Sequence, residues 1–369
     1  SGLRTQDSGL CLVVMSRDEW LARQFPNGTL SIGEVVSRTG WMHSAGGTGP
    51  YLSLKARKAS LTRQQVDDAV YRRFEVVELP AVRDSMMLVP REDIGLALAA
   101  GRRSFAERIR KFPSVNALAD RIVKTLGDGV RSADSLRDEL PPRLITNLGE
   151  AGKKLGFSST LPIALRLLQV QGRVLRLAED FRLDAKRYFY RRWPESLPIS
   201  EAPKNLDGAL AERFLAWAAP SSPEDFAFWC GITKTSAKKL LTGAPKPPAS
   251  HATKFVMLLP FRDNYFALHR DLTAFAKGIT LLDMSNKPAP IAKLASLHHN
   301  AIVAGGELRG IWEYDPAEEK IIWKTFHKTA GVEAAVKETE AFIREELGDH
   351  KYYALDHGRT REVRLAFIR

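Results

Sequence analysis

Residues 41–57, with the sequence WMHSAGGTGPYLSLKAR, decide how the rest of the chain is interpreted. Three glycines and a proline fall within five positions; glycine is entropically costly in a helix and proline removes a backbone donor. We therefore expect a shaped loop here. It carries a lone histidine, His43, and leads into Lys55, Arg57 and Lys58. The loop is either a place where the backbone of a polyanion approaches closely or a connecting turn.

Helical and extended segments surround this loop in a definite order. Residues 18–24 and 31–39 have apolar residues at helical spacing, and residues 63–73 form a third such segment. Residues 75–90 then contain two β-forming runs around a polar break. Three helices followed by a two-stranded ribbon are the order of a winged helix.

The same order recurs further along the chain, without a residue-for-residue period. A second round has helices at 115–126, 132–140 and 161–171, followed by strands at 174–177 and 188–190. A third round has helices at 209–218, 222–229 and 235–241, followed by extended chain at 255–260. These are architectural repeats, and the pattern predicts three winged helices in tandem.

The last hundred residues predict a smaller α+β unit. We expect three strands, at 300–304, 308–314 and 320–326, then a helix at 332–347 and an edge strand at 362–367. Together with the repeats, this gives four predicted domains. Their boundaries are 1–112 for the first winged helix with the glycine-rich loop, 113–200 for the second, 201–260 for the third and 261–369 for a β-rich α+β domain.

The chain is strongly basic, and the excess is unevenly placed. The formal net charge is +12 and the sequence pI is about 9.7. Residues 54–112 hold 13 Lys or Arg against 8 Asp or Glu, residues 131–192 hold 13 against 7, and residues 313–349 hold 5 against 10. A chain that is basic in its first half and acidic near its end favours a polyanionic partner such as nucleic acid.

The cysteines and the apolar runs limit the class of protein. Cys11 and Cys230 have no motif spacing, so they indicate neither a disulfide framework nor a zinc site. His298 and His299 lack further ligands nearby in the sequence. The sequence has no run of about 18 apolar residues, the length that a membrane-spanning helix needs. We expect a cytoplasmic, nucleoid-associated monomer without metal or other cofactor.

Several segments, in this order, resemble the winged-helix DNA-binding proteins of the AlkZ/YcaQ-type DNA glycosylase family. They are residues 49–57, 61–63, 83–93, 165–174, 223–226 and 258–264. The resemblance implies an α+β fold with three tandem winged helices around a DNA-binding concavity and a C-terminal β-rich domain. It implies double-stranded DNA as the partner, alkylated or crosslinked. It further implies excision of bulky N-alkylated purines, or unhooking of interstrand crosslinks, by metal-free hydrolysis of the N-glycosidic bond.

The family's catalytic signature, Gln-x-Gln or Gln-x-Asp, matches His43 and Ala45 in this chain. Releasing an already cationic purine needs a positioned water and stabilisation of an oxocarbenium-like sugar. His43 could hold or deprotonate that water, because imidazole titrates near neutrality, whereas Ala45 can do neither. Three readings stay open: a monofunctional DNA glycosylase with His43 as its catalytic residue, a non-catalytic DNA-binding protein that regulates or recognises damage, or a protein-interaction scaffold that uses winged helices. The charge asymmetry favours the first two over the scaffold.

Cationic side chains on the loop, the recognition helices and the wings are the candidate DNA contacts, since they would neutralise phosphates and position the duplex. They are Lys55, Arg57, Lys58, Arg83, Lys153, Lys154, Arg166, Arg173, Arg187, Arg191 and Arg192. Tyr51 is a candidate for stacking against or wedging beside a displaced base.

Overall fold

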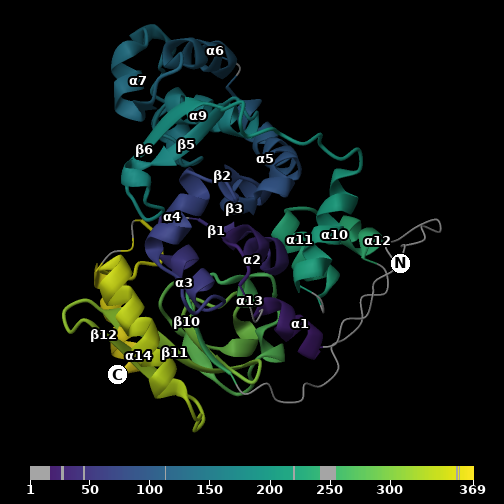
Figure 1. Ribbon diagram of the computed structural model, residues 1–369. Coiled ribbons are helices and arrows are strands. Elements are labelled where there is room, and N and C mark those ends of the chain that lie inside the picture. Colours follow the sequence, from purple (N-terminus) through teal and green to yellow (C-terminus); the bar gives the residue numbers. More distant parts are fainter. Residues whose placement is uncertain are drawn as a thin grey trace. The chain divides into compact units, whose positions relative to one another are not determined.

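The protein divides into two compact units, each described here by itself. The computed structural model (Figure 1) describes residues 17–25, 29–44, 46–112, 114–218, 221–241, 255–354, 356 and 358–369. One unit comprises residues 1–66 and 210–369, and the other residues 67–209. Helices α4 (Arg63–Tyr71) and α10 (Leu206–Ala218) cross the two boundaries.

The first unit joins both ends of the chain around one antiparallel sheet, in the order β12-β11-β10-β7. Its strands are β7 (Val256–Leu259), β10 (Asn300–Ala304), β11 (Glu307–Asp315) and β12 (Lys320–Thr325). The three strands predicted in the last hundred residues are confirmed. Because β7 pairs with β10, the extended segment expected to end the third repeat belongs to this sheet.

Helices from the two ends of the chain build the rest of the first unit. They are α1 (Arg17–Gln24), α2 (Ile32–Thr39), α3 (Gly49–Lys55), α11 (Pro223–Cys230), α12 (Lys234–Leu240), α13 (Asn264–Ala267), α14 (Val332–Phe342) and α15 (Gly358–Ile368). The short strands are β1 (Met42–His43), β8 (Thr280–Leu282) and β9 (Pro288–Pro290). Trp20 and Leu21 of α1, with Phe25 directly after the helix, lie in one hydrophobic core with Leu259 and Ile311 of the sheet.

Two predictions for this unit are wrong. The stretch expected to be a loop turns helical at Gly49, where α3 begins; Pro50 stands in its first turn, where no intrahelical donor is lost. Residues 362–367, expected to form an edge strand, lie in α15. Its buried face consists of Arg361, Arg364, Leu365 and Ile368, which is helical spacing.

The second unit contains two helix-and-hairpin arrangements. Its elements are β2 (Val76–Pro80), β3 (Met86–Pro90), α5 (Ile94–Ile109), α6 (Val115–Leu126), β4 (Arg131–Ser132), α7 (Ala133–Glu139), α8 (Gly149–Lys153), α9 (Thr160–Val170), β5 (Val174–Ala178) and β6 (Tyr188–Arg192). Strands β2 and β3 pair antiparallel, and β4, β6 and β5 form a second sheet. Side chains of α5, α6 and α9 share one core.

The two hairpins of the second unit turn in the same unusual way. Arg83 and Asp84 follow β2 with φ of +56° each, and Asp180 and Phe181 follow β5 with φ of +53° and +54°. Left-handed backbone is uncommon for residues other than glycine. The two hairpins therefore share one turn geometry, with two consecutive left-handed residues after the first strand of each.

Candidate functional site

The backbone that leads into His43 is fixed by buried contacts. Trp41 packs on Trp217 with ring centroids 5.6 Å apart. The Asn264 side-chain amide donates hydrogen bonds to the carbonyl oxygens of Thr39 and Trp41, at 3.1 and 3.2 Å. These contacts set the direction in which strand β1 carries the imidazole.

The glycine loop after His43 is clamped to a segment from the far end of the chain. The Thr48 amide donates to the Lys351 carbonyl at 3.0 Å, and the Lys351 amide donates to the Thr48 hydroxyl at 3.0 Å. A Cβ on Gly47 would lie 2.5 Å from the Lys351 carbonyl oxygen, so no larger residue fits there. The close backbone approach therefore explains one of the three glycines.

A buried histidine completes this clamp. The Thr48 hydroxyl lies 2.7 Å from Nδ1 of His350, and Nε2 of the same ring lies 3.0 Å from Oδ1 of Asn300. Burial, together with the charges of Arg361 and Arg364, lowers the pKa of His350 well below 6.5. The neutral ring therefore donates from Nε2 to Asn300 and accepts at Nδ1 from Thr48.

His43 lies on the wall of a small recess in the first unit and is half-buried. The recess is lined by Met42, His43, Gly47, Gly49, Pro50, Ser53, Phe261, Arg262, Asn264 and Tyr352. Its volume of about 20 Å³ is room for about one water molecule. Ala45, the other residue that matches the family signature, lies outside the described residues. The recess can hold a single water beside an imidazole.

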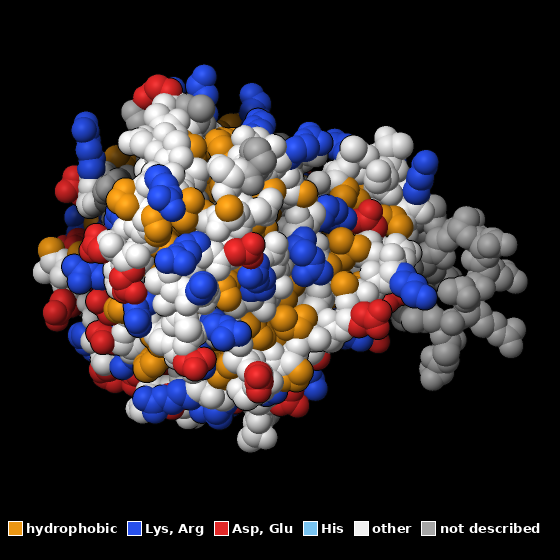
Figure 2. Space-filling model, turned by 90° about the horizontal axis from the view of Figure 1, so that it is seen from above, with side chains coloured by type: hydrophobic (Ala, Val, Ile, Leu, Met, Phe, Trp, Pro, Cys, Tyr) orange, Lys and Arg blue, Asp and Glu red, His pale blue; other side chains and the backbone are white. Residues whose placement is uncertain are grey.

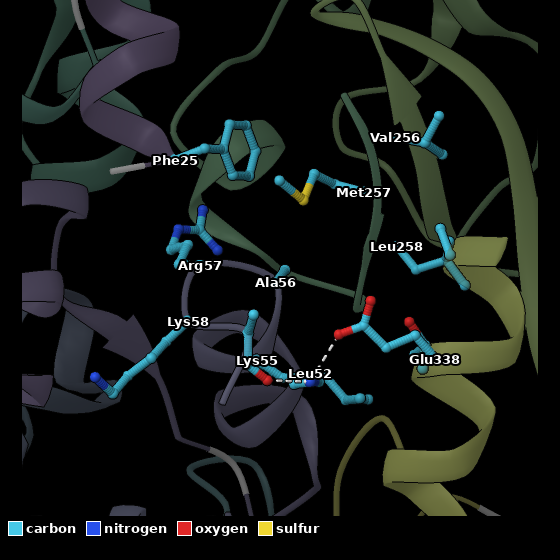
Figure 3. Close-up of a pocket in the computed structure, with 13 residues that line it drawn as sticks. Phe25, Leu52, Lys55, Ala56, Arg57, Lys58, Val256, Met257, Leu258 and Glu338 are labelled. Carbon is cyan, nitrogen blue, oxygen red and sulfur yellow. Dashed lines mark hydrogen bonds and ion pairs between the residues drawn. The ribbon is translucent and has the colours of Figure 1, made fainter. Parts of the chain in front are cut away.

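A second pocket of the first unit, of about 340 Å³, contains three of the predicted DNA contacts (Figure 3). The Lys55 ammonium lies 2.8 Å from a carboxylate oxygen of Glu338 and also contacts the Ala59 carbonyl. The charge of Lys55 is therefore largely met within the protein. Lys58 donates to the Leu30 carbonyl at 2.9 Å.

The prediction that Arg57 contacts DNA is corrected by its burial. Its guanidinium forms two hydrogen bonds with the Asp263 carboxylate, at 2.7 and 2.8 Å, and the exposed fractions of the two side chains are 0% and 1%. Burial alone would raise the pKa of Asp263, but the charge and hydrogen bonds of Arg57 hold it below its usual value. Tyr51 is likewise fully buried, so its ring is part of the core and not a surface wedge.

The remaining predicted contacts lie in the second unit, and most of them are exposed. Figure 2 shows one face of the molecule, with many Lys and Arg side chains among hydrophobic ones and fewer Asp and Glu. The exposed predicted residues are Arg83, Lys154, Arg173, Arg187 and Arg192. The side chain of Lys153 lies outside the described residues. Exposed ion pairs, such as Arg173 with Asp120 at 2.9 Å, are worth little and leave the cation available.

Two predicted contacts of this unit are half-buried. Arg166 lies 3.6 Å from the carboxylate of Asp84, and burial lowers the pKa of Arg166. Asp84 also accepts from Arg108 at 2.9 Å. Arg166 therefore belongs to a partly buried ionic cluster at the first hairpin, and Arg191 on β6 is half-buried as well.

The structure also brings residues to the recess that the sequence did not single out. Arg262 lies within residues 258–264, but nothing in that segment distinguished it, and Asn264 and Tyr352 gave no signal of their own. Across the described ranges, no three His, Cys, Asp or Glu side chains are arranged to hold a metal ion. Within the same ranges, no helix is long and apolar enough to cross a bilayer.

Comparisons with known proteins define the class. Residues 36–349 match the model of the family described as DNA glycosylase AlkZ-like, so the chain belongs to the AlkZ-like DNA glycosylase family. No curated protein matches the chain significantly. In fold it is similar to the solved structure of Streptomyces sahachiroi DNA glycosylase AlkZ, with a TM-score of 0.63 and 16% identity over 92% of this chain and 99% of that one. It is a DNA glycosylase-like protein, and the family supports DNA as its partner and DNA repair as its setting.

Proposed function

We propose that this protein excises bulky N-alkylated purines from double-stranded DNA, or unhooks purine crosslinks, by hydrolysing the N-glycosidic bond with a water held beside His43. The observation that carries the proposal is the recess itself: it has room for about one water and has the imidazole on its wall. In the sequence, His43 stands at the position that matches the family's catalytic signature.

The proposed step needs little beyond what the recess offers. An alkylated purine already carries positive charge, so it leaves as a neutral base when the bond between C1′ of the sugar and the purine nitrogen breaks. The water oxygen forms the new bond to C1′, and His43 accepts the proton that the water releases. The sugar is positively charged in the transition state, and the nearby DNA phosphates stabilise that charge.

The DNA-binding part of the proposal rests on the second unit. We infer that α10 to α12 of the first unit form a third winged helix in tandem with the two helix-and-hairpin arrangements, and that the second unit binds the duplex. Arg83, Lys154, Arg173, Arg187 and Arg192 would neutralise phosphates there, because their charged groups are exposed.

The activity is tested by incubating duplexes that carry defined bulky N-alkylated purines with the protein and scoring abasic sites. We expect release by the wild type and a loss of at least 100-fold in rate for His43→Ala, since general bases contribute about 10²–10⁴-fold. His327→Ala is the matched control, because His327 is an exposed histidine of the same unit and lies outside the recess. Release by His43→Ala at the wild-type rate would remove His43 from the mechanism.

A specific observation favours a second candidate, a non-catalytic DNA-binding protein that regulates or recognises damage. Position 45, where the family signature has a second polar residue, is alanine, which can neither bind nor orient water. If the wild type binds the damaged duplexes but releases no base above background on several adducts, this second function replaces the first.

A further inference from the structure

Arg262 combines a strained backbone with a position at the candidate site. Its φ is +63°, in the left-handed region that glycine adopts freely and other residues adopt at a cost. The residue lies between Phe261 and Asp263, both buried, and its own side chain is exposed. Strain of this kind, when it persists, is found disproportionately at functional sites.

Neighbouring contacts hold the strained residue in place. Asp263 is anchored by the buried ion pair with Arg57, and its carboxylate also accepts from the Tyr265 amide at 2.9 Å. On the other side, the Phe261 amide donates to Oδ1 of Asn300 at 2.7 Å. The backbone at position 262 is therefore fixed from both directions, and the side chain is projected outward from a rigid base.

The guanidinium has a defined position beside the recess. Its carbon lies 5.0 Å from the centre of the Phe261 ring, a cation–π distance, and Arg262 lines the recess together with His43. Burial and the charge of Arg262 lower the pKa of His298 to about 4, so that ring stays neutral near pH 7. Among the residues that line the recess, Arg262 is the arginine, and no lysine stands beside it.

Other residues with positive φ do not share this combination. Glu319, at +52°, is exposed in the turn between β11 and β12, and the recess does not include it. Arg83, Asp84, Asp180 and Phe181 belong to the hairpins of the second unit. Strain alone therefore does not select Arg262; the strain, the exposed cation and the recess occur together only there among the described residues.

We propose that Arg262 binds the DNA phosphodiester next to the nucleotide whose base is presented to His43, and so sets the register of the duplex at the recess. The inference rests on the proposed DNA-binding function and deepens it. A planar guanidinium suits this task, because it binds two phosphate oxygens at once. The backbone strain is the cost of directing that group toward the recess.

The test compares Arg262→Gly with Glu319→Gly, a second exposed left-handed residue of the same unit. Both substitutions relieve strain, so we expect both variants to melt at or above the wild-type temperature. Only Arg262→Gly should weaken duplex binding, by about tenfold or more, and lower the slope of log K against log salt by about 1.

The outcomes separate the two proposals. If the wild type binds duplex DNA and Arg262→Gly binds with the same affinity and salt slope, the role of Arg262 is overturned and DNA binding stands. If Arg262→Gly melts well below the wild type with an unchanged salt slope, the arginine is structural. If the wild type itself does not bind DNA at low salt, both proposals are wrong. If the wild type binds inorganic phosphate and not duplex DNA, and Arg262→Gly loses the phosphate binding, Arg262 marks a site for free phosphate instead.

Discussion

Replacing Arg57 tests directly whether this residue holds the fold together or binds DNA. Its guanidinium is the buried partner of Asp263 and also donates to the Ser53 carbonyl at 2.8 Å. Arg57→Met keeps most of the aliphatic stem but leaves the Asp263 carboxylate buried without its cation. Removing one partner of a buried pair costs about 3–5 kcal/mol. Since domains are stable by only about 5–15 kcal/mol, about a fifth or more of the stability would be lost.

We expect this loss to appear as a drop of about 10 °C in the melting temperature, given a shift of about 2–4 °C per kcal/mol in proteins of a few hundred residues. Differential scanning calorimetry measures it. Arg344→Ala is the control, because the pair of Arg344 with Glu340 is partly exposed, lies one helical turn apart at 3.5 Å, and should be worth only about 0.3–0.5 kcal/mol. Arg57→Met with Asp263→Asn should lose less than the sum of the two single changes, since no charge is left buried.

The pair also makes a pH prediction with a definite sign. The pKa of Asp263 is lower in the folded protein than its usual 3.8. The stabilisation is therefore present above pH 3.8 and is lost as the pH falls through the lower, folded-state value.

An Arg57→Met variant that melts with the wild type, yet binds DNA with a salt slope lower by about 1, would refute the structural role and restore the original prediction of a phosphate contact.

Two further predictions concern the clamp on the glycine loop. Gly47→Ala should destabilise the protein and abolish base release, because its Cβ would lie 2.5 Å from the Lys351 carbonyl oxygen. Gly358→Ala is the control for both melting and activity, because a Cβ at position 358 would meet no atom within 4 Å. Because the pKa of His350 is far below 6.5 in the folded state, the unfolded chain binds the extra proton first, so stability should fall as the pH drops below about 6.5. His350→Gln should flatten that part of a pH series of melting temperatures, and an unchanged profile would contradict the assignment.

Local periodicity was sufficient to predict most elements of the fold. The helix expected at 115–126 is α6 to the residue, and the strand expected at 300–304 is β10. Helix α5 was missed because its first half, residues 94–101, is an almost continuous run of apolar residues and glycine. Such a run shows no amphipathic period, since its residues are nearly all buried in the second unit.

Helix α15, predicted as an edge strand over residues 362–367, has two arginines on its buried face. The structure buries Arg361 and Arg364 on the same helical face as Leu365 and Ile368. Ion pairs with Asp349 and Glu313, at 3.0 and 2.5 Å, make that burial tolerable. A pattern that counts only apolar residues as buried cannot recognise a face of this kind.

The site was harder to predict than the fold because its determinants are far apart in the sequence. Arg57 looked like a phosphate contact because nothing near it shows that Asp263, 206 positions away, takes up its charge. His43 was identified from its neighbours, yet the loop beside it is held by Thr48 and His350, which are 302 positions apart. A cation in a glycine-rich loop therefore indicates DNA contact only once the fold shows its charge to be available. Arg57 does not meet that condition, because its guanidinium is buried against Asp263.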